Sequence, residues 1–188
     1  MGRRVTYDTP LSFVEVTARL EKELNKEGAG PNLLRVLYEA SKTKEELHNG
    51  LREIIGDHQF VYVLIISSLN LMHVGTYLVR RYFFPIEHHH FVRAYTGVDA
   101  PQAVVYYFGN PLLGQAILRE DLSMGMSTPA KLIVLEKEDG SGTQVVYDDP
   151  AATNRAPAWP GKSVSEELAR LSDLASEKID RLLEAVTA

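Results

Sequence analysis

The stretch from Phe108 to Pro150 constrains the fold of this chain more than any other part of its sequence. Asn110-Pro111 has the pattern of a helix N-cap followed by proline in the first helical position. Asp139-Gly140 lies between two runs rich in β-branched residues, which is typical of a hairpin. The pattern predicts, in order, a strand at Ala103–Phe108, a helix from Pro111 to about Ser123, and strands at Lys131–Glu136 and Thr143–Tyr147.

Further helices and strands are predicted on both sides of this stretch. Apolar residues spaced three and four apart form a one-sided stripe over Ser163–Val186, which is typical of an amphipathic helix packed on a core. The other expected elements are a strand at Arg3–Tyr7, a helix capped by Thr9 with Pro10 in its first turn, a helix at Thr43–Ile55 with a capping box, and a buried central strand at Phe60–Ile66. We therefore predict an α+β fold, a small mixed or antiparallel sheet with helices packed on one face.

The length and composition fit one compact domain. The chain has 188 residues, 45% of them hydrophobic, which is enough for a substantial core. We expect a single α+β domain over residues 1–188, with its core at about 3–150, a linker at 151–162 and a C-terminal helix at 163–186.

Charge and cysteine content exclude several classes of function. The formal net charge is −5, whereas a nucleic-acid-binding surface needs a basic patch, so we expect no nucleic-acid partner. The sequence has no cysteine, which removes disulfides, thiolate nucleophiles and cysteine-type zinc sites.

Membrane association is not expected either. The longest apolar-rich stretch, Phe60–Met72, is interrupted by polar residues and is too short to cross a bilayer. The first residues lack the apolar run of a signal peptide. We expect a soluble cytoplasmic protein with no membrane partner.

The same central stretch resembles the domain of unknown function 302 family. The matching features are Gly109-Asn110-Pro111, Arg119-Glu120-Asp121, Pro129, Asp139-Gly140 and Pro150, with the helix Ser163–Val186 as the counterpart of the family's final helix. The resemblance implies a two-layer α+β sandwich that forms a homodimer. It implies no reaction.

His88-His89-His90 is the segment that suggests a metal. In a strand, His88 and His90 would share one face, while His89 would point to the other. Two imidazoles with Glu87 or a distant carboxylate suit a divalent zinc, iron or copper ion. The alternative is that the three histidines belong to a polar loop.

A second group of candidate ligand-binding residues lies in the central stretch. Asn110 would cap a helix whose exposed N–H groups can also receive an anion or a carbonyl. Arg119 and Asp121 lie near the other end of that helix, and nine residues of helix span about 13.5 Å, so Asn110 and Arg119 cannot hold one small group together. Their alternative roles are capping and ion pairing. Tyr107 would line an aromatic pocket or pack in the core, and Asp148-Asp149 would form a solvated strand end.

Three functional hypotheses follow from these residues. The leading one is a homodimeric protein that binds a small ligand or a partner, with a pocket between Ile86–Tyr95 and the Gly109-Asn110 turn. Its candidate binding residues are His88, His90, Tyr107, Asn110, Arg119 and Asp121. The alternatives are a metal-dependent enzyme that uses His88 and His90, and a purely structural dimer.

Overall fold

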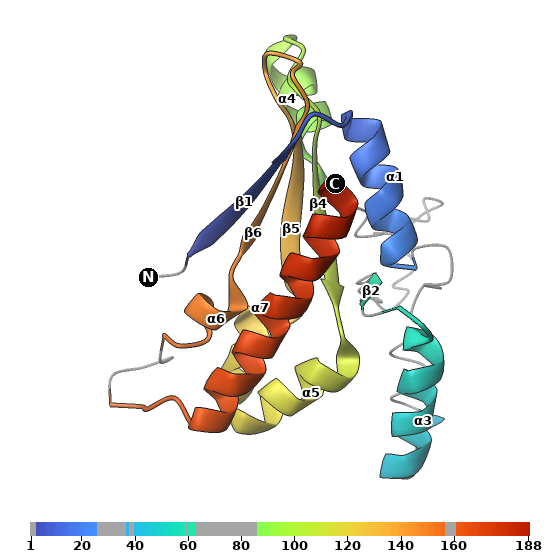
Figure 1. The fold of residues 1–188 in the computed structure, drawn as a ribbon, viewed down its shortest axis with the longest axis vertical. Helices are drawn as coiled ribbons and strands as arrows, with labels where there is room; N and C mark the ends of the chain where they lie inside the picture. Colours follow the sequence, from blue (N-terminus) through green and yellow to red (C-terminus); the bar gives the residue numbers. More distant parts are fainter. Residues whose placement is uncertain (1–2, 26–36, 38–39, 59, 63–85, 157–160) are drawn as a thin grey trace, which may run out of the picture.

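The computed structural model describes residues 3–25, 37, 40–58, 60–62, 86–156 and 161–188. Within these residues one sheet runs in the order β1-β6-β5-β4-β2, and β3 pairs with β4 beside that path (Figure 1). Every one of these described pairs is antiparallel. The strands are β1 (Arg4–Thr9), β2 (Val61–Tyr62), β3 (Ile86–Glu87), β4 (Ala103–Gly109), β5 (Ala130–Glu136) and β6 (Thr143–Asp148).

The helices lie between and after these strands. They are α1 (Phe13–Glu23), α3 (Lys44–Ile55), α4 (His88–Thr96), α5 (Pro111–Glu120), a 3-10 helix η1 (Leu122–Met126), α6 (Pro150–Thr153) and α7 (Glu166–Thr187). The predicted α+β fold is confirmed, and among the described strands the sheet is antiparallel rather than mixed.

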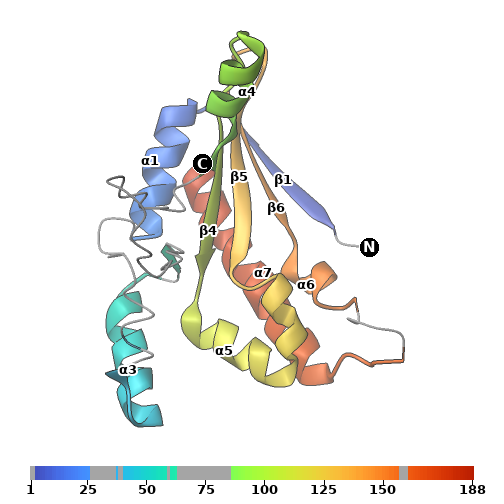
Figure 2. The same ribbon diagram turned by 180° about the vertical axis from the view of Figure 1, so that it is seen from behind.

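The core forms between α1, α7 and one face of the sheet. Burial alternates along β4 and β6, as expected for strands with one covered face. Tyr106, Leu132 and Val145 on that face meet Leu20 of α1 and Leu183 of α7 in one apolar cluster. The two opposite views place both helices on the same side of the sheet (Figures 1 and 2). The stripe of the final helix therefore packs on the sheet, as predicted.

The β5–β6 hairpin joins β1 at a close backbone approach. Gly142 has φ of +138°, and a Cβ atom there would lie 2.1 Å from the carbonyl oxygen of Thr9. The Thr143 hydroxyl donates to the Leu11 carbonyl at 2.8 Å. This hydrogen bond holds the segment that follows β1 against the start of β6. Only glycine fits this position, because both the space and the backbone angle exclude a side chain.

Two predicted helix boundaries were wrong. Thr9 remains in β1, paired with Thr143, and the first helix is capped by Ser12, whose hydroxyl accepts the Glu15 N–H at 3.2 Å. Strand pairing thus outweighed the Thr-Pro capping pattern. The helix after Asn110 ends at Glu120 instead of Ser123, because Asp121 accepts the Ser123 N–H and starts η1.

Other predicted features lie partly or wholly outside the described residues. Of the strand expected at Phe60–Ile66, the structure describes Val61–Tyr62 as β2, which is the last strand on the described path and not a central one. Residues 63–66 lie outside the described part. The expected linker at 151–162 contains part of a short helix, α6. Among the helices of the described ranges, none combines the length and apolarity needed to span a bilayer.

Candidate functional site

The three histidines begin a helix and do not form a strand. β3 ends at Glu87, and His88–Thr96 forms α4, which ends at Gly97 with φ of +72°. The run is therefore neither the strand that would put His88 and His90 on one face nor the polar loop that was its alternative. Successive side chains on a helix point about 100° apart, so His88 and His90 diverge.

A different trio comes together at this corner of the chain. Glu87, His89 and His90 each offer a ligand atom, and these atoms lie within 4.8 Å of one another. His90 Nδ1 is 2.6 Å from Glu87 Oε2, and the rings of His89 and His90 are 4.2 Å apart between centroids. The arrangement brings together two of the three histidines, and His88 is exposed outside the trio.

The ring of His89 is held by the backbone of β4. Its Nδ1 lies 3.1 Å from the amide nitrogen and 3.2 Å from the carbonyl oxygen of Ala103. Glu87 pairs with Val104 in the β3–β4 ladder. The ring of His89, the second residue after Glu87, therefore reaches Ala103, which precedes Val104 in β4. This contact fixes the position of His89, which is half-buried, while Glu87 and His90 are exposed.

The rest of α4 exposes large apolar side chains. None of its nine residues is buried. Phe91 is 72% exposed and Tyr95 85%, and their rings stack with centroids 6.3 Å apart. Val92 and Val98 are exposed nearby. The helix lies at one end of the sheet, beside the β5–β6 hairpin (Figure 1). Exposed apolar patches on a small domain mark contact surfaces.

A hollow of about 650 Å³ lies at the β5–β6 hairpin. Its lining combines an apolar floor with charged groups of the hairpin: Pro101, Leu135, Glu136, Lys137, Glu138, Asp139 and Gln144. Leu135 pairs with Ala103, the residue that holds His89, and also with Gln144. Leu135 thus lines the hollow, while its partner Ala103 contacts His89 in the histidine corner, the corner formed by Glu87, His89 and His90.

Asn110 lies at the opposite end of β4 from the histidines. Glu87 pairs with Val104, whereas Gly109 pairs with Val61 at the other end of the strand. Five residues of strand span about 17 Å, so the Gly109-Asn110 turn and the histidine corner cannot share a small ligand. Asn110 Oδ1 accepts the N–H groups of Leu112 and Leu113 at 3.0 and 3.1 Å, which makes it the cap of α5.

Asp121 and Arg119 have separate surroundings. Asp121 is 7% exposed and accepts the hydroxyl and N–H of Ser123, while Lys162 Nζ lies 2.5 Å from its carboxylate. Lys162 and these hydrogen bonds lower the pKa of Asp121 to about 2. Arg119 is exposed in the last turn of α5. Tyr107 is half-buried on β4, on the face opposite Tyr106.

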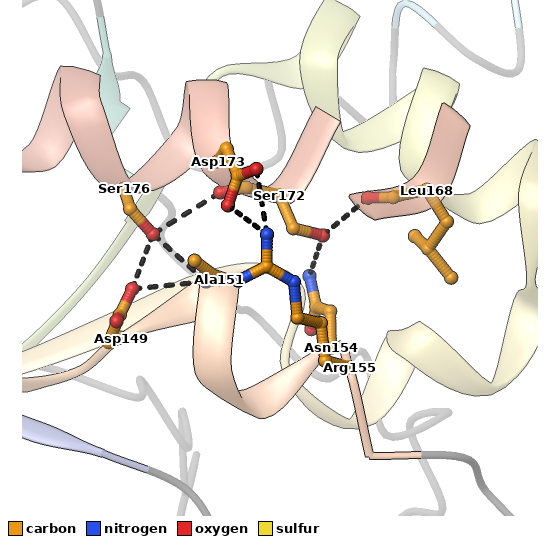
Figure 3. Close-up of polar contacts among 8 residues, drawn as sticks. All are labelled: Asp149, Ala151, Asn154, Arg155, Leu168, Ser172, Asp173 and Ser176. Atoms are coloured by element: carbon orange, nitrogen blue, oxygen red, sulfur yellow. Dashed lines mark hydrogen bonds and ion pairs between the residues drawn. The ribbon is translucent and has the colours of Figure 1, made fainter. Parts of the chain in front are cut away.

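A polar cluster that was not predicted from the sequence is buried between α6 and α7 (Figure 3). Asp149, expected in a solvated strand end, is 8% exposed and accepts hydrogen bonds from Ala151 N–H and the Ser176 hydroxyl. Asn154 donates to the Ser172 hydroxyl at 3.1 Å and accepts from Ser127 at 2.7 Å. Two signals could have revealed it, the Asp149-Pro150 capping pair and the serines within the apolar stripe of the last helix.

A second missed group links the sheet to α7. Tyr7 of β1 and Tyr147 of β6 both donate to Asp180 Oδ1, at 2.8 and 2.5 Å. Burial raises the pKa of both phenols, and the carboxylate of Asp180 raises it further. Neutral tyrosines that donate to one carboxylate stabilise the packing of α7 on the sheet.

The architecture defines an α+β protein whose antiparallel sheet is covered by helices on one face. The family pattern of Domain of unknown function DUF302 matches residues 82–186. The chain belongs to the DUF302 family. Its family segment contains the histidine corner, β4 to β6 and nearly all of α7.

A solved structure supports the same fold. The crystal structure of uncharacterized conserved protein DUF302 from Bacillus stearothermophilus is similar to this chain with a TM-score of 0.57. The two sequences are 15% identical, and the similarity covers 97% of each chain. The comparison with curated proteins finds no match.

Proposed function

We propose that this protein is a homodimeric binding protein that contacts its second copy through α4. The observation that carries the proposal is the exposure of Phe91, Val92, Tyr95 and Val98 on and just after a helix with no buried residue. A monomer gains nothing from such a surface, because each of these side chains remains in water.

A second copy of the chain is the partner that fits best. A two-fold interface uses the same patch on both protomers, so an apolar helix finds a matching apolar surface on its own copy. The flat stack of Phe91 on Tyr95 provides an aromatic surface of the kind enriched in interface centres. The homodimer implied by the family resemblance supports the same choice.

The dimer is expected to be weak. The patch comprises only α4 and the turn that follows it. It therefore has fewer residues than the roughly 20–30 per side of a standard interface. We therefore expect the protein to be monomeric at low micromolar concentration and dimeric at several hundred micromolar.

The test is light scattering or sedimentation across this concentration range with a Phe91→Ser, Tyr95→Ser variant. The variant should remain monomeric throughout and should melt at the native temperature, since both side chains are exposed. Val14→Ser, at a 66% exposed position on α1, is the matched control and should dimerise normally. A native chain that stays monomeric, or a control that fails equally, contradicts the proposal.

The hollow at the β5–β6 hairpin is the proposed place for a small ligand. Its volume lies within the roughly 300–1,000 Å³ of ligand pockets, and its lining has three acidic residues, Glu136, Glu138 and Asp139, against one lysine, Lys137. A cationic ligand suits this lining. A panel of small amines and neutral metabolites should therefore show melting-temperature increases with amines only, and a Glu138→Gln variant should reduce them. A purely structural dimer predicts no increase with any compound.

A further inference from the structure

We propose that Glu87, His89 and His90 form a binding site for a divalent transition-metal ion, zinc being the simplest case. The proposal stands apart from the dimer, since it concerns the first residues of α4 and not its apolar side. It rests on two independent observations: the convergence of three ligand groups, and a backbone contact that orients one of them.

The convergence results from the change from strand to helix at Glu87. The carboxylate at the end of β3 lies beside the first turn of α4, and this places Glu87 Oε2 at 2.6 Å from His90 Nδ1. Ligand atoms on a tetrahedral zinc ion lie about 3.4 Å apart. The 2.6 Å contact must therefore open and separations near the 4.8 Å limit must close, which rotation of the exposed Glu87 and His90 side chains allows.

The contact of His89 with β4 prepares its second nitrogen for a metal. Nδ1 faces both the N–H and the carbonyl of Ala103, so either neutral tautomer forms one hydrogen bond there. When Nδ1 carries the proton and donates to the Ala103 carbonyl, Nε2 presents a free lone pair. A backbone carbonyl that receives the other ring N–H is the usual second partner of a metal-bound histidine. Metal binding should therefore select this tautomer.

The donor set determines the class of metal. Two imidazoles and one carboxylate, without thiolates, suit zinc, iron(II), cobalt(II), nickel or copper, whereas calcium and magnesium prefer sites made of oxygen donors. Three ligands from the protein leave coordination positions for water or for a small anion. The exposure of Glu87 and His90 keeps these positions accessible.

His88 supplies a matched control within the same histidine run. It lies next to His89 and two residues from His90 in sequence, yet it is outside the trio. Untagged native protein, His88→Ala, His90→Ala and Glu87→Gln variants are titrated with zinc chloride in a calorimeter, with calcium chloride as the comparison ion. We expect one zinc per chain for the native protein and for His88→Ala. His90→Ala should bind at least tenfold more weakly, Glu87→Gln should also be weakened, and calcium should give no heat.

Nitrogen-15 NMR of the imidazole rings checks the site in the unmodified chain. Zinc should shift the ring nitrogens of His89 and His90, leave those of His88 in place, and put the His89 proton on Nδ1. The proposal is overturned by an absence of stoichiometric zinc, by a loss in His88→Ala equal to that in His90→Ala, or by zinc-induced shifts confined to the other histidines.

Discussion

Lys162 Nζ lies 2.5 Å from Asp121 Oδ2, and this ion pair joins the segment before α7 to the junction between α5 and η1. The side chain of Asp121 is 6% exposed and that of Lys162 27%. Asp121 was a candidate for ligand binding, but its carboxylate caps η1 and pairs with this lysine. The same carboxylate therefore contributes to stability in a way that depends on pH.

Asp121 should stabilise the fold above about pH 4 and lose this effect at lower pH. Its folded pKa of about 2 lies below the ordinary pKa of 3.8, so the stabilisation is complete above the unfolded pKa and disappears as pH falls toward 2. Urea midpoints of native protein and Asp121→Asn should therefore differ clearly at pH 6 and converge near pH 2. A difference that stays constant over this range would show that the charge of Asp121 has no role.

Tyr7 and Tyr147 should make the fold sensitive to alkali. The folded pKa of each is raised by burial and by Asp180, so their stabilisation is complete below the unfolded value of about 10 and is lost as pH rises above it. Between pH 9 and 11.5, the melting temperature of a Tyr7→Phe, Tyr147→Phe variant should fall by less than that of the native chain. Tyr95→Phe, at an 85% exposed position, is the control and should follow the native curve.

Asn110 should matter for stability through its cap. Asn110→Ala removes the acceptor for two N–H groups at the start of α5 and should cost about 1 kcal/mol in urea unfolding. Asn110→Ser keeps a capping oxygen and should recover most of this loss. Equal destabilisation by both substitutions would point to a role of Asn110 other than capping.

Asn154 and its neighbour Arg155 should differ sharply in their effects (Figure 3). Asn154 is 2% exposed and bonds to Ser172 and Ser127, so Asn154→Ala should cost about 2–3 kcal/mol. Arg155 pairs with Asp173 at 2.6 Å on the surface, where both side chains are about half exposed, so Arg155→Ala should cost roughly 0–1 kcal/mol. Guanidinium unfolding of both variants measures the two values, and similar costs would contradict the distinction.

Local sequence signals predicted most of the elements that are described. Asn110-Pro111, the hairpin around Asp139-Gly140 and the apolar stripe of the last helix each carry their structural reason within a few residues. The family resemblance over Phe108–Pro150 is confirmed by the match over residues 82–186. The error at Thr9 arose because pairing with β6 extends β1 through Thr9, so the helix cap lies at Ser12 instead.

By itself, the sequence determined the α+β class, the order of the predicted elements of the central stretch, the face of the last helix that is buried, and the family. Caps, turns and apolar periodicity are local and need no knowledge of distant residues. Only the tertiary structure decided which side chains meet. The backbone of β4 holds the ring of His89 beside Glu87 and His90, Asn110 lies at the far end of the same strand, and Asp149 is buried because α7 packs beside it. Convergence of residues depends on strand register and helix packing, which arise from contacts between segments far apart in the chain.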